Sequence, residues 1–216
     1  MKIASTNANE VFRTLIWTVD LAPEAYKPLN KSLKKAIEAE SVERESVPLG
    51  SNWQTDVDFH RKPAFAELVD FINSGAKSAF DFLEIKYNAF AITGCWANIA
   101  PPGTKHRVHN HPNNYLSGVY YVQAPEGGDS IEFIDPRPQA NIINPDVKRK
   151  NPYNTSVLNL EAKEGRLVMF HSYLLHSVPV NQGKRDRISI AFDIMFPNFT
   201  ESMSSPKFHG NAHAKE

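Results

Sequence analysis

From residue 90 to residue 196 the sequence is a series of short apolar segments, and this feature limits the possible folds more than any other. Each segment has about the length of a β-strand and is rich in β-branched and aromatic residues. The segments span residues 90–99, 117–123, 130–134, 157–160, 166–170 and 186–196. Clusters of Pro, Gly and Asn separate several of them, as at 101–103, 125–128 and 181–183. Many short strands in series predict an antiparallel sandwich or barrel.

The first 90 residues have the periodicity of helices instead. Pro23 suits the first turn of a helix, and apolar residues follow it at helical spacing. These residues are Leu29, Leu33, Ala36 and Ile37. A second apolar face runs over about 63–86 and predicts a longer helix, with a break at 73–75 where Asn, Ser and Gly stand together.

These patterns predict a single domain over residues 1–216 that is mainly β with N-terminal helices. Residues 1–90 are expected to be mostly helical and to support a β core over 90–197. Residues 135–156 are rich in Pro and Asn and are expected to form a long surface loop. Residues 198–216 are expected to form a polar tail that frays.

Charge and composition exclude several classes of function. The 24 Lys and Arg residues balance the 24 Asp and Glu residues, which argues against a nucleic-acid partner. No apolar run approaches the roughly 18 residues of a membrane span, so no membrane partner is expected either. A single cysteine, Cys95, excludes an internal disulfide and any zinc site made of several cysteines. The chain starts without the apolar run of a signal peptide, and a reducing cytoplasm is the expected location. The sequence carries no signal for an oligomeric state.

Three of the eight histidines, His106, His109 and His111, lie within six positions. In an extended segment residues i and i+2 point to the same side, so His109 and His111 can present two imidazoles to one point. Pro112 favours an extended His111. His176 is the candidate for a third imidazole. His106 is expected to be a loop histidine, and the alternative is a histidine that lies next to the metal ligands. Spacing alone agrees equally well with a chance cluster of surface histidines.

A charged residue also stands in an apolar strand. Arg187, Ser189 and Ala191 share one face of the segment 186–196, and the alternate positions are apolar. An arginine on an inward face is costly unless it meets an anion, and a guanidinium suits a carboxylate. The alternative is an arginine that faces solvent. Of the neighbouring Tyr120 and Tyr121, one must face inward, either with a partner for its hydroxyl or as ordinary core packing.

Taken in order, these residues resemble the iron(II)- and 2-oxoglutarate-dependent oxygenases, and within them a bacterial and phage branch related to the prolyl hydroxylases. The resemblance covers about residues 50–197. It rests on His109-x-His111, the segment 117–121, the glycine turn at 127–128, His176 and Arg187-x-Ser189. It implies a double-stranded β-helix, a jelly-roll barrel with helices packed on one side.

The resemblance also implies a site and a reaction. The implied iron(II) ligands are His109, His111 and His176. The co-substrate 2-oxoglutarate would chelate the metal through its C1 carboxylate and keto oxygen, and its distal carboxylate would meet Arg187. Tyr121 and Ser189 are the implied hydroxyl partners of that carboxylate. The implied activity hydroxylates a C–H bond with release of succinate and carbon dioxide. The substrate, a small molecule or a protein side chain, is not identified by the sequence.

One position departs from the usual pattern of this superfamily, His-x-Asp/Glu…His. His111 stands where a carboxylate is usual, although the His-x-His pattern matches the branch. Whether His111 binds the metal is therefore left open, and the carboxylates of Asp129, Glu132 and Asp135 are the alternatives.

Two other classes of function stay open. A cupin-like dioxygenase would use three histidines without 2-oxoglutarate, and it would not need Arg187 to face the pocket. A non-catalytic jelly-roll binding module would hold zinc or nothing on its histidines. Metal analysis and consumption of 2-oxoglutarate separate these classes from the oxygenase.

Overall fold

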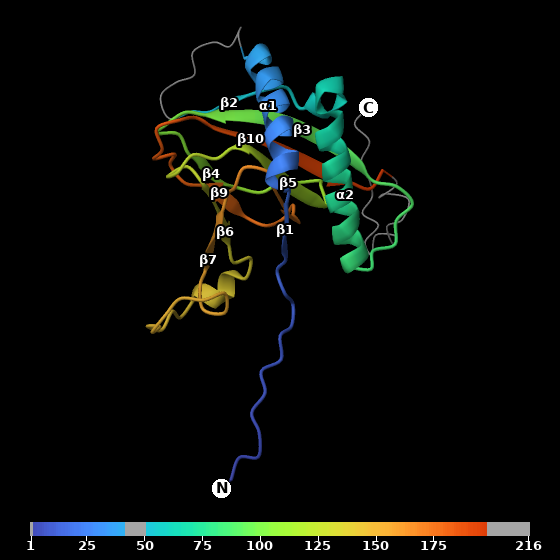
Figure 1. The fold of residues 1–216 in the computed structure, drawn as a ribbon. Helices are drawn as coiled ribbons and strands as arrows, with labels where there is room; N and C mark the ends of the chain where they lie inside the picture. The colour runs from blue at the N-terminus through green and yellow to red at the C-terminus, as the bar shows by residue number, and fades with distance from the viewer. Residues whose placement is uncertain (1, 42–50, 198–216) are drawn as a thin grey trace, which may run out of the picture.

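The computed structural model describes residues 2–41 and 51–197, whose strands form two antiparallel sheets (Figure 1). The larger sheet has the order β1-β8-β5-β10-β3-β2, and the smaller one has the order β4-β9-β6-β7. The strands are β1 (Ile16–Asp20), β2 (Trp53–Gln54), β3 (Ala91–Ala100), β4 (His106–His109), β5 (Leu116–Gln123), β6 (Ser130–Ile134), β7 (Val157–Glu161), β8 (Arg166–His171), β9 (His176–Val178) and β10 (Arg187–Met195). The predicted class, mainly β with N-terminal helices, is confirmed.

All six strands predicted from the apolar segments are present, with ends within two residues of the expected ones. The sequence reasoning missed β1, β2, β4 and β9, which have between two and five residues and carry too little pattern to stand out. The expectation that residues 1–90 are mostly helical was too broad, because β1 pairs with β8 and residues 2–15 have no regular structure. That all 216 residues form one domain stays a prediction, and the tail 198–216 lies outside the described residues.

Two long helices, α1 (Pro23–Glu40) and α2 (Ala66–Phe82), lie on the same side of the larger sheet (Figure 1). Pro23 stands in the first turn of α1, as predicted. The predicted break at 73–75 was wrong, because α2 is continuous there. Gly75 instead lets the helix approach β8: a Cβ at this position would lie 2.8 Å from Leu167 Cδ2. Within the described residues no helix is both long and apolar enough to cross a bilayer.

Strand β10 separates an apolar layer from a polar one. On its helix side lie the buried Ile188, Ile190, Phe192 and Ile194, which join the core against α1 and α2. The alternate positions face the smaller sheet, and they are Arg187, Ser189, Ala191 and Asp193. The alternation of the strand therefore brings one cationic and one anionic residue into the interior between the sheets.

A buried asparagine fixes the same alternation on β5. Asn30 of α1 donates from Nδ2 to the carbonyl of Val122 at 2.9 Å, and Tyr120 Oη donates to Asn30 Oδ1 at 2.6 Å. These bonds hold Tyr120 on the helix side of the sheet. Because neighbouring residues of a strand point to opposite faces, Tyr121 faces the interior between the sheets.

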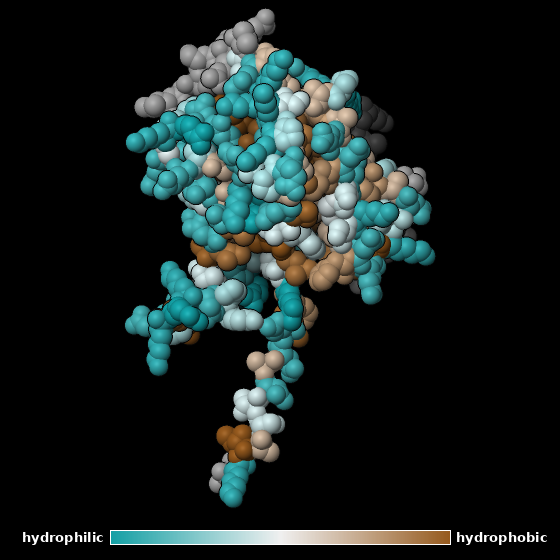
Figure 2. All heavy atoms as spheres, in the orientation of Figure 1, coloured by the Kyte–Doolittle hydropathy of each residue, from teal (hydrophilic) through white to brown (hydrophobic). Residues whose placement is uncertain are grey.

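The connection between β6 and β7 and the N-terminal segment extend away from the body (Figure 1). The predicted loop at 135–156 is confirmed, except for one turn of 3₁₀-helix at Pro138–Asn141. Two further 3₁₀ turns, Phe59–Arg61 and Pro63–Phe65, lead into α2. On the face drawn in Figure 2, apolar residues gather where the body meets these extensions, and the upper part is largely hydrophilic.

Candidate metal centre

Three histidines meet at one edge of the smaller sheet. His109 ends β4 and His176 begins β9, and the two residues pair directly across these antiparallel strands. His111 follows two residues after β4. One possible ligand atom from each residue lies within 4.8 Å of the other two. The trio that the sequence singled out is therefore brought together at a spacing that suits one metal ion.

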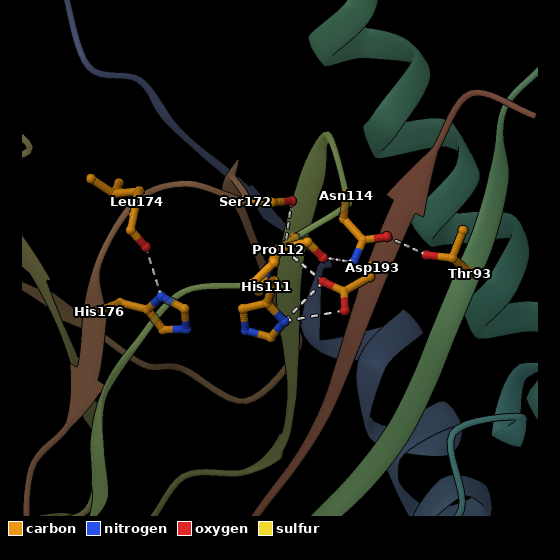
Figure 3. A network of polar contacts seen from close by, with 9 residues as sticks. Thr93, His111, Pro112, Asn114, Ser172, Leu174, His176 and Asp193 are labelled. Atoms are coloured by element: carbon orange, nitrogen blue, oxygen red, sulfur yellow. Dashed lines mark hydrogen bonds and ion pairs between the residues drawn. The ribbon is translucent and has the colours of Figure 1, made fainter. Parts of the chain in front are cut away.

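Hydrogen bonds select the nitrogen that each imidazole can offer. His109 Nδ1 donates to the carbonyl of Arg107 at 2.8 Å, and His176 Nδ1 donates to the carbonyl of Leu174 at 2.9 Å. His111 Nδ1 lies 3.0 and 3.1 Å from the two carboxylate oxygens of Asp193 (Figure 3). A histidine that donates from Nδ1 keeps the lone pair on Nε2. The three Nε2 atoms are therefore the donors for a cation.

Burial keeps His109 and His176 in the form that binds metal. Loss of hydration lowers the pKa of His176 to about 3, and it also lowers the pKa of His109. The neighbouring imidazoles lower both pKa values further, because two protonated rings would repel each other. A neutral imidazole is the metal-ligating form, so the site is prepared for a cation near neutral pH.

Sequence reasoning missed the carboxylate that lies beside the trio, Asp193. Its side chain is buried, and Ser117 Oγ donates to its Oδ1 at 2.6 Å. The signal was present, because the alternation of Arg187, Ser189 and Ala191 reaches Asp193 two residues later. None of the three carboxylates weighed as alternative ligands belongs to the histidine group. Glu132 accepts from Ser177 Oγ at 3.0 Å, and Asp135 pairs with Arg137 at 2.8 Å.

The histidines line a cavity of about 70 Å³ between the two sheets. Its lining also includes Arg187, Tyr121 and Ser189, so all six side chains predicted for the site border the same cavity. Ser189 stands at the centre of a row across three strands, opposite Tyr121 on β5 and Asn98 on β3. The structure thus brings the predicted site residues together.

Arg187 is a buried cation with few polar contacts among the described residues. Arg187 is only 6% exposed, and its one hydrogen bond among the described residues is a long contact of 3.4 Å from Nη1 to the carbonyl of Gly128. Within residues 2–41 and 51–197 no carboxylate pairs with it, and burial lowers its pKa. The hydroxyl of Tyr121 also has no hydrogen-bond partner among the described residues, and burial raises its pKa. This end of the cavity therefore suits an anion.

Two further aromatic rings enclose the trio. His106 begins β4, borders the cavity and stacks on His109 at 4.3 Å between ring centroids. The expectation that it is a loop histidine was wrong, since the short β4 escaped sequence reasoning. Trp96 of β3 stacks on His111 at 5.8 Å, with 23° between the ring planes. These contacts restrict the orientation of two of the three candidate ligands.

Comparison with known proteins supports the same chemistry. Residues 94–193 match the protein family described as "Putative 2OG-Fe(II) oxygenase". This segment contains all three histidines, Arg187 and Asp193. No curated protein sequence gives a significant match.

Solved structures share the fold at low sequence identity. A non-heme α-ketoglutarate-dependent epimerase from nogalamycin biosynthesis, SnoN, aligns with a TM-score of 0.63 and 12% identity over 85% of this chain and 79% of its own. A Pseudomonas putida prolyl-4-hydroxylase aligns with a TM-score of 0.57 and 16% identity over 85% and 93%. HygX from Streptomyces hygroscopicus, solved with nickel and 2-oxoglutarate bound, aligns with a TM-score of 0.61 and 14% identity over 86% and 84%. The predicted double-stranded β-helix is confirmed by these alignments.

Proposed function

We propose that this chain is an iron(II)- and 2-oxoglutarate-dependent oxygenase, which holds its iron on the Nε2 atoms of His109, His111 and His176 and hydroxylates a C–H bond of its substrate. The observation that carries the proposal is the meeting, in a single cavity, of three imidazoles and one buried arginine that has no carboxylate partner among the described residues. The imidazoles can bind a cation, and the arginine can bind an anion.

The donor set fits iron(II). Imidazole nitrogen is a common ligand of divalent first-row metals, and three such donors on one side leave other positions of an octahedral ion open. Three neutral ligands leave the charge of the ion at +2. The two carboxylates of 2-oxoglutarate offset that charge, so a protein carboxylate among the ligands is not required for neutrality.

The other end of the cavity fits the distal carboxylate of 2-oxoglutarate. Arg187 offers a planar pair of N–H donors, which matches the two oxygens of a carboxylate. Tyr121 and Ser189 border the same space with hydroxyl groups. In the proposed role these three residues bind and orient the co-substrate.

When bound, iron(II) and 2-oxoglutarate supply the oxidising chemistry, in which dioxygen is consumed, succinate and carbon dioxide leave, and one oxygen atom enters the substrate. The chain itself binds and positions these groups. The polar side chains of Asn52, Asn98 and Lys105 also border the cavity and are candidates to orient the substrate. The substrate itself is a small molecule or a protein side chain.

Arg187 also weighs against the two other classes of function. A three-histidine dioxygenase without a co-substrate, or a binding module without one, would bury this cation in the cavity with no anion to match it. An uncompensated buried charge costs several kcal/mol, so a chain without such an anion would gain by losing the charge.

Succinate formation tests the proposal. The purified chain is incubated with iron(II), 2-oxoglutarate and oxygen, and succinate is measured by proton NMR. We expect slow formation of succinate that requires iron and is lost in His176→Ala. An Arg185→Met variant serves as the control, because Arg185 is exposed and lies outside the cavity lining. Equal succinate in wild type and His176→Ala would contradict the proposal.

A further inference from the structure

We infer that Asp193 is a positioning residue that places a negative charge directly behind His111 and so takes over, through a hydrogen bond, the part that a ligating carboxylate plays in the usual 2-His-1-carboxylate site. This inference rests on the proposed function, because it takes the three Nε2 atoms as the iron ligands. It concerns the one ligand position at which this chain departs from the usual pattern.

The geometry joins Asp193 to His111 alone among the three ligands. Both carboxylate oxygens lie within 3.1 Å of His111 Nδ1 (Figure 3). His109 and His176 bond to neutral backbone carbonyls instead. The residue that replaces the usual carboxylate is therefore the only one of the three that is backed by a full negative charge.

The charge balance of the interior points the same way. Asp193 is only 7% exposed, and a buried carboxylate needs a nearby cation. Within the described part of the chain the only basic side chain within 4 Å of the carboxylate is the imidazole of His111, which carries a positive charge only when it is protonated. Arg187 lies on the same face of β10 but six residues away, which is roughly 20 Å along a strand. The missing positive charge is accounted for if a metal ion sits on the opposite nitrogen of the His111 ring.

A chain of hydroxyl groups holds the carboxylate in place. Ser172 Oγ lies 2.8 Å from Ser117 Oγ, which in turn donates to Asp193 Oδ1 at 2.6 Å. The backbone N–H of His111 donates to the carbonyl of the same Ser172 at 2.9 Å. The carboxylate and the ring that it contacts are thus tied to one turn, between β8 and β9. This leaves the carboxylate no need to reorient when a metal binds.

The expected effect is on the metal and its spectrum rather than on folding alone. A carboxylate behind a ligating histidine makes the imidazole a stronger donor and fixes its tautomer, and loss of such a partner typically weakens metal binding about 10- to 100-fold. A weaker donor also leaves the iron d electrons at lower energy. The visible charge-transfer band of the iron–2-oxoglutarate chelate should then move to shorter wavelength.

Asp193→Asn tests this inference, since it keeps the shape of the side chain and an oxygen acceptor but removes the charge. Iron(II) affinity is measured anaerobically by competition with a chromogenic chelator, and the band is recorded after 2-oxoglutarate is added. Glu132→Gln is the matched control, because Glu132 is a carboxylate on β6 beside the site that contacts Ser177 and no ligand. We expect about 10- to 100-fold weaker binding and the band shift in Asp193→Asn only.

A measurement on the wild-type chain guards against a variant that fails to fold. In the zinc(II)-loaded protein, the Nδ1 proton of His111 should resonate downfield of those of His109 and His176, because its acceptor is a carboxylate rather than a carbonyl. Equal iron affinity and an unmoved band in Asp193→Asn, or an Nδ1 proton of His111 that is not the most downfield, would overturn the role of Asp193 and leave the proposed function intact. A wild-type chain that binds no iron would overturn the proposed function itself.

Discussion

Replacement of Arg187 by methionine is the perturbation that separates the co-substrate role from every other use of the cavity. Methionine keeps an unbranched apolar stem of similar length and removes the charge. Because Arg187 makes only one hydrogen bond within the described residues, a long contact of 3.4 Å to the carbonyl of Gly128, its removal should break little internal structure. The apoprotein should be at least as stable after the change, since an unpaired buried charge is lost.

The effect on 2-oxoglutarate follows from the burial of the arginine. Loss of one partner of a buried, hydrogen-bonded charge pair costs about 2–5 kcal/mol. At 1.4 kcal/mol for each factor of ten, the dissociation constant should rise roughly 30- to 4,000-fold. Arg187→Lys should lie between the wild type and Arg187→Met, because lysine keeps the charge but cannot form the two-pronged contact.

Calorimetric titration of iron-loaded protein under anaerobic conditions measures the change, with two ligands compared. Pyruvate shares the carboxylate and keto group of 2-oxoglutarate but has no distal carboxylate. Arg187→Met should therefore weaken 2-oxoglutarate strongly and pyruvate hardly at all, while the control Arg185→Met changes neither. The reasoning is refuted if Arg187→Met binds 2-oxoglutarate as tightly as the wild type, or if both ligands weaken equally.

Three other perturbations follow from the same structure. His109→Ala and His176→Ala should each abolish stoichiometric iron binding in metal analysis, and retention of iron by both variants would remove these residues from the ligand set. Burial lowers the folded-state pKa of His176 to about 3 and of His106 to about 4, so the unfolded chain binds more protons below pH 6.5. The stabilising contribution of these two histidines should therefore be fully present above pH 6.5. Toward pH 4 the free energy of unfolding of the apoprotein, measured in urea titrations, should fall by up to about 1 kcal/mol per pH unit for each group. A flat profile would count against buried, neutral imidazoles at these two positions. Gly118→Ala should lower the free energy of unfolding by about 1–3 kcal/mol, because its Cβ would lie 2.3 Å from Phe192 Cζ; a loss under about 0.5 kcal/mol would show that this packing is less tight than it looks.

Strand alternation is the pattern that predicted most of the site from sequence. It placed Arg187 and Ser189 on one face of β10, and the structure has both on the cavity. The same alternation continues to Asp193, two residues beyond Ala191, so this carboxylate could also be placed on the inward face from sequence. A buried cation and a buried anion on one face of an apolar strand give the same sequence signal.

The part of the site that could not be predicted from sequence depends on pairing between strands that are far apart in the chain. His176 meets His109 because β4 pairs with β9, and these strands have four and three residues, too few for a period to be recognised. In such short strands tertiary contacts decide the conformation, and β-propensity adds little. The helix break predicted at Gly75 was wrong because a tertiary contact, and not the local sequence, explains this glycine. Its lack of a side chain serves the close packing of α2 on Leu167, which no local pattern reveals.

An anaerobic titration tests the metal centre most directly. Iron(II) is added to the metal-free wild-type chain, and 2-oxoglutarate is then added while the visible spectrum is recorded. We predict one equivalent of bound iron and a weak charge-transfer band that appears only with 2-oxoglutarate and saturates at one equivalent. The same band should be missing in His176→Ala. A chain that binds iron without any 2-oxoglutarate-dependent band, or that binds no iron, would show that these three histidines and Arg187 do not form an oxygenase site.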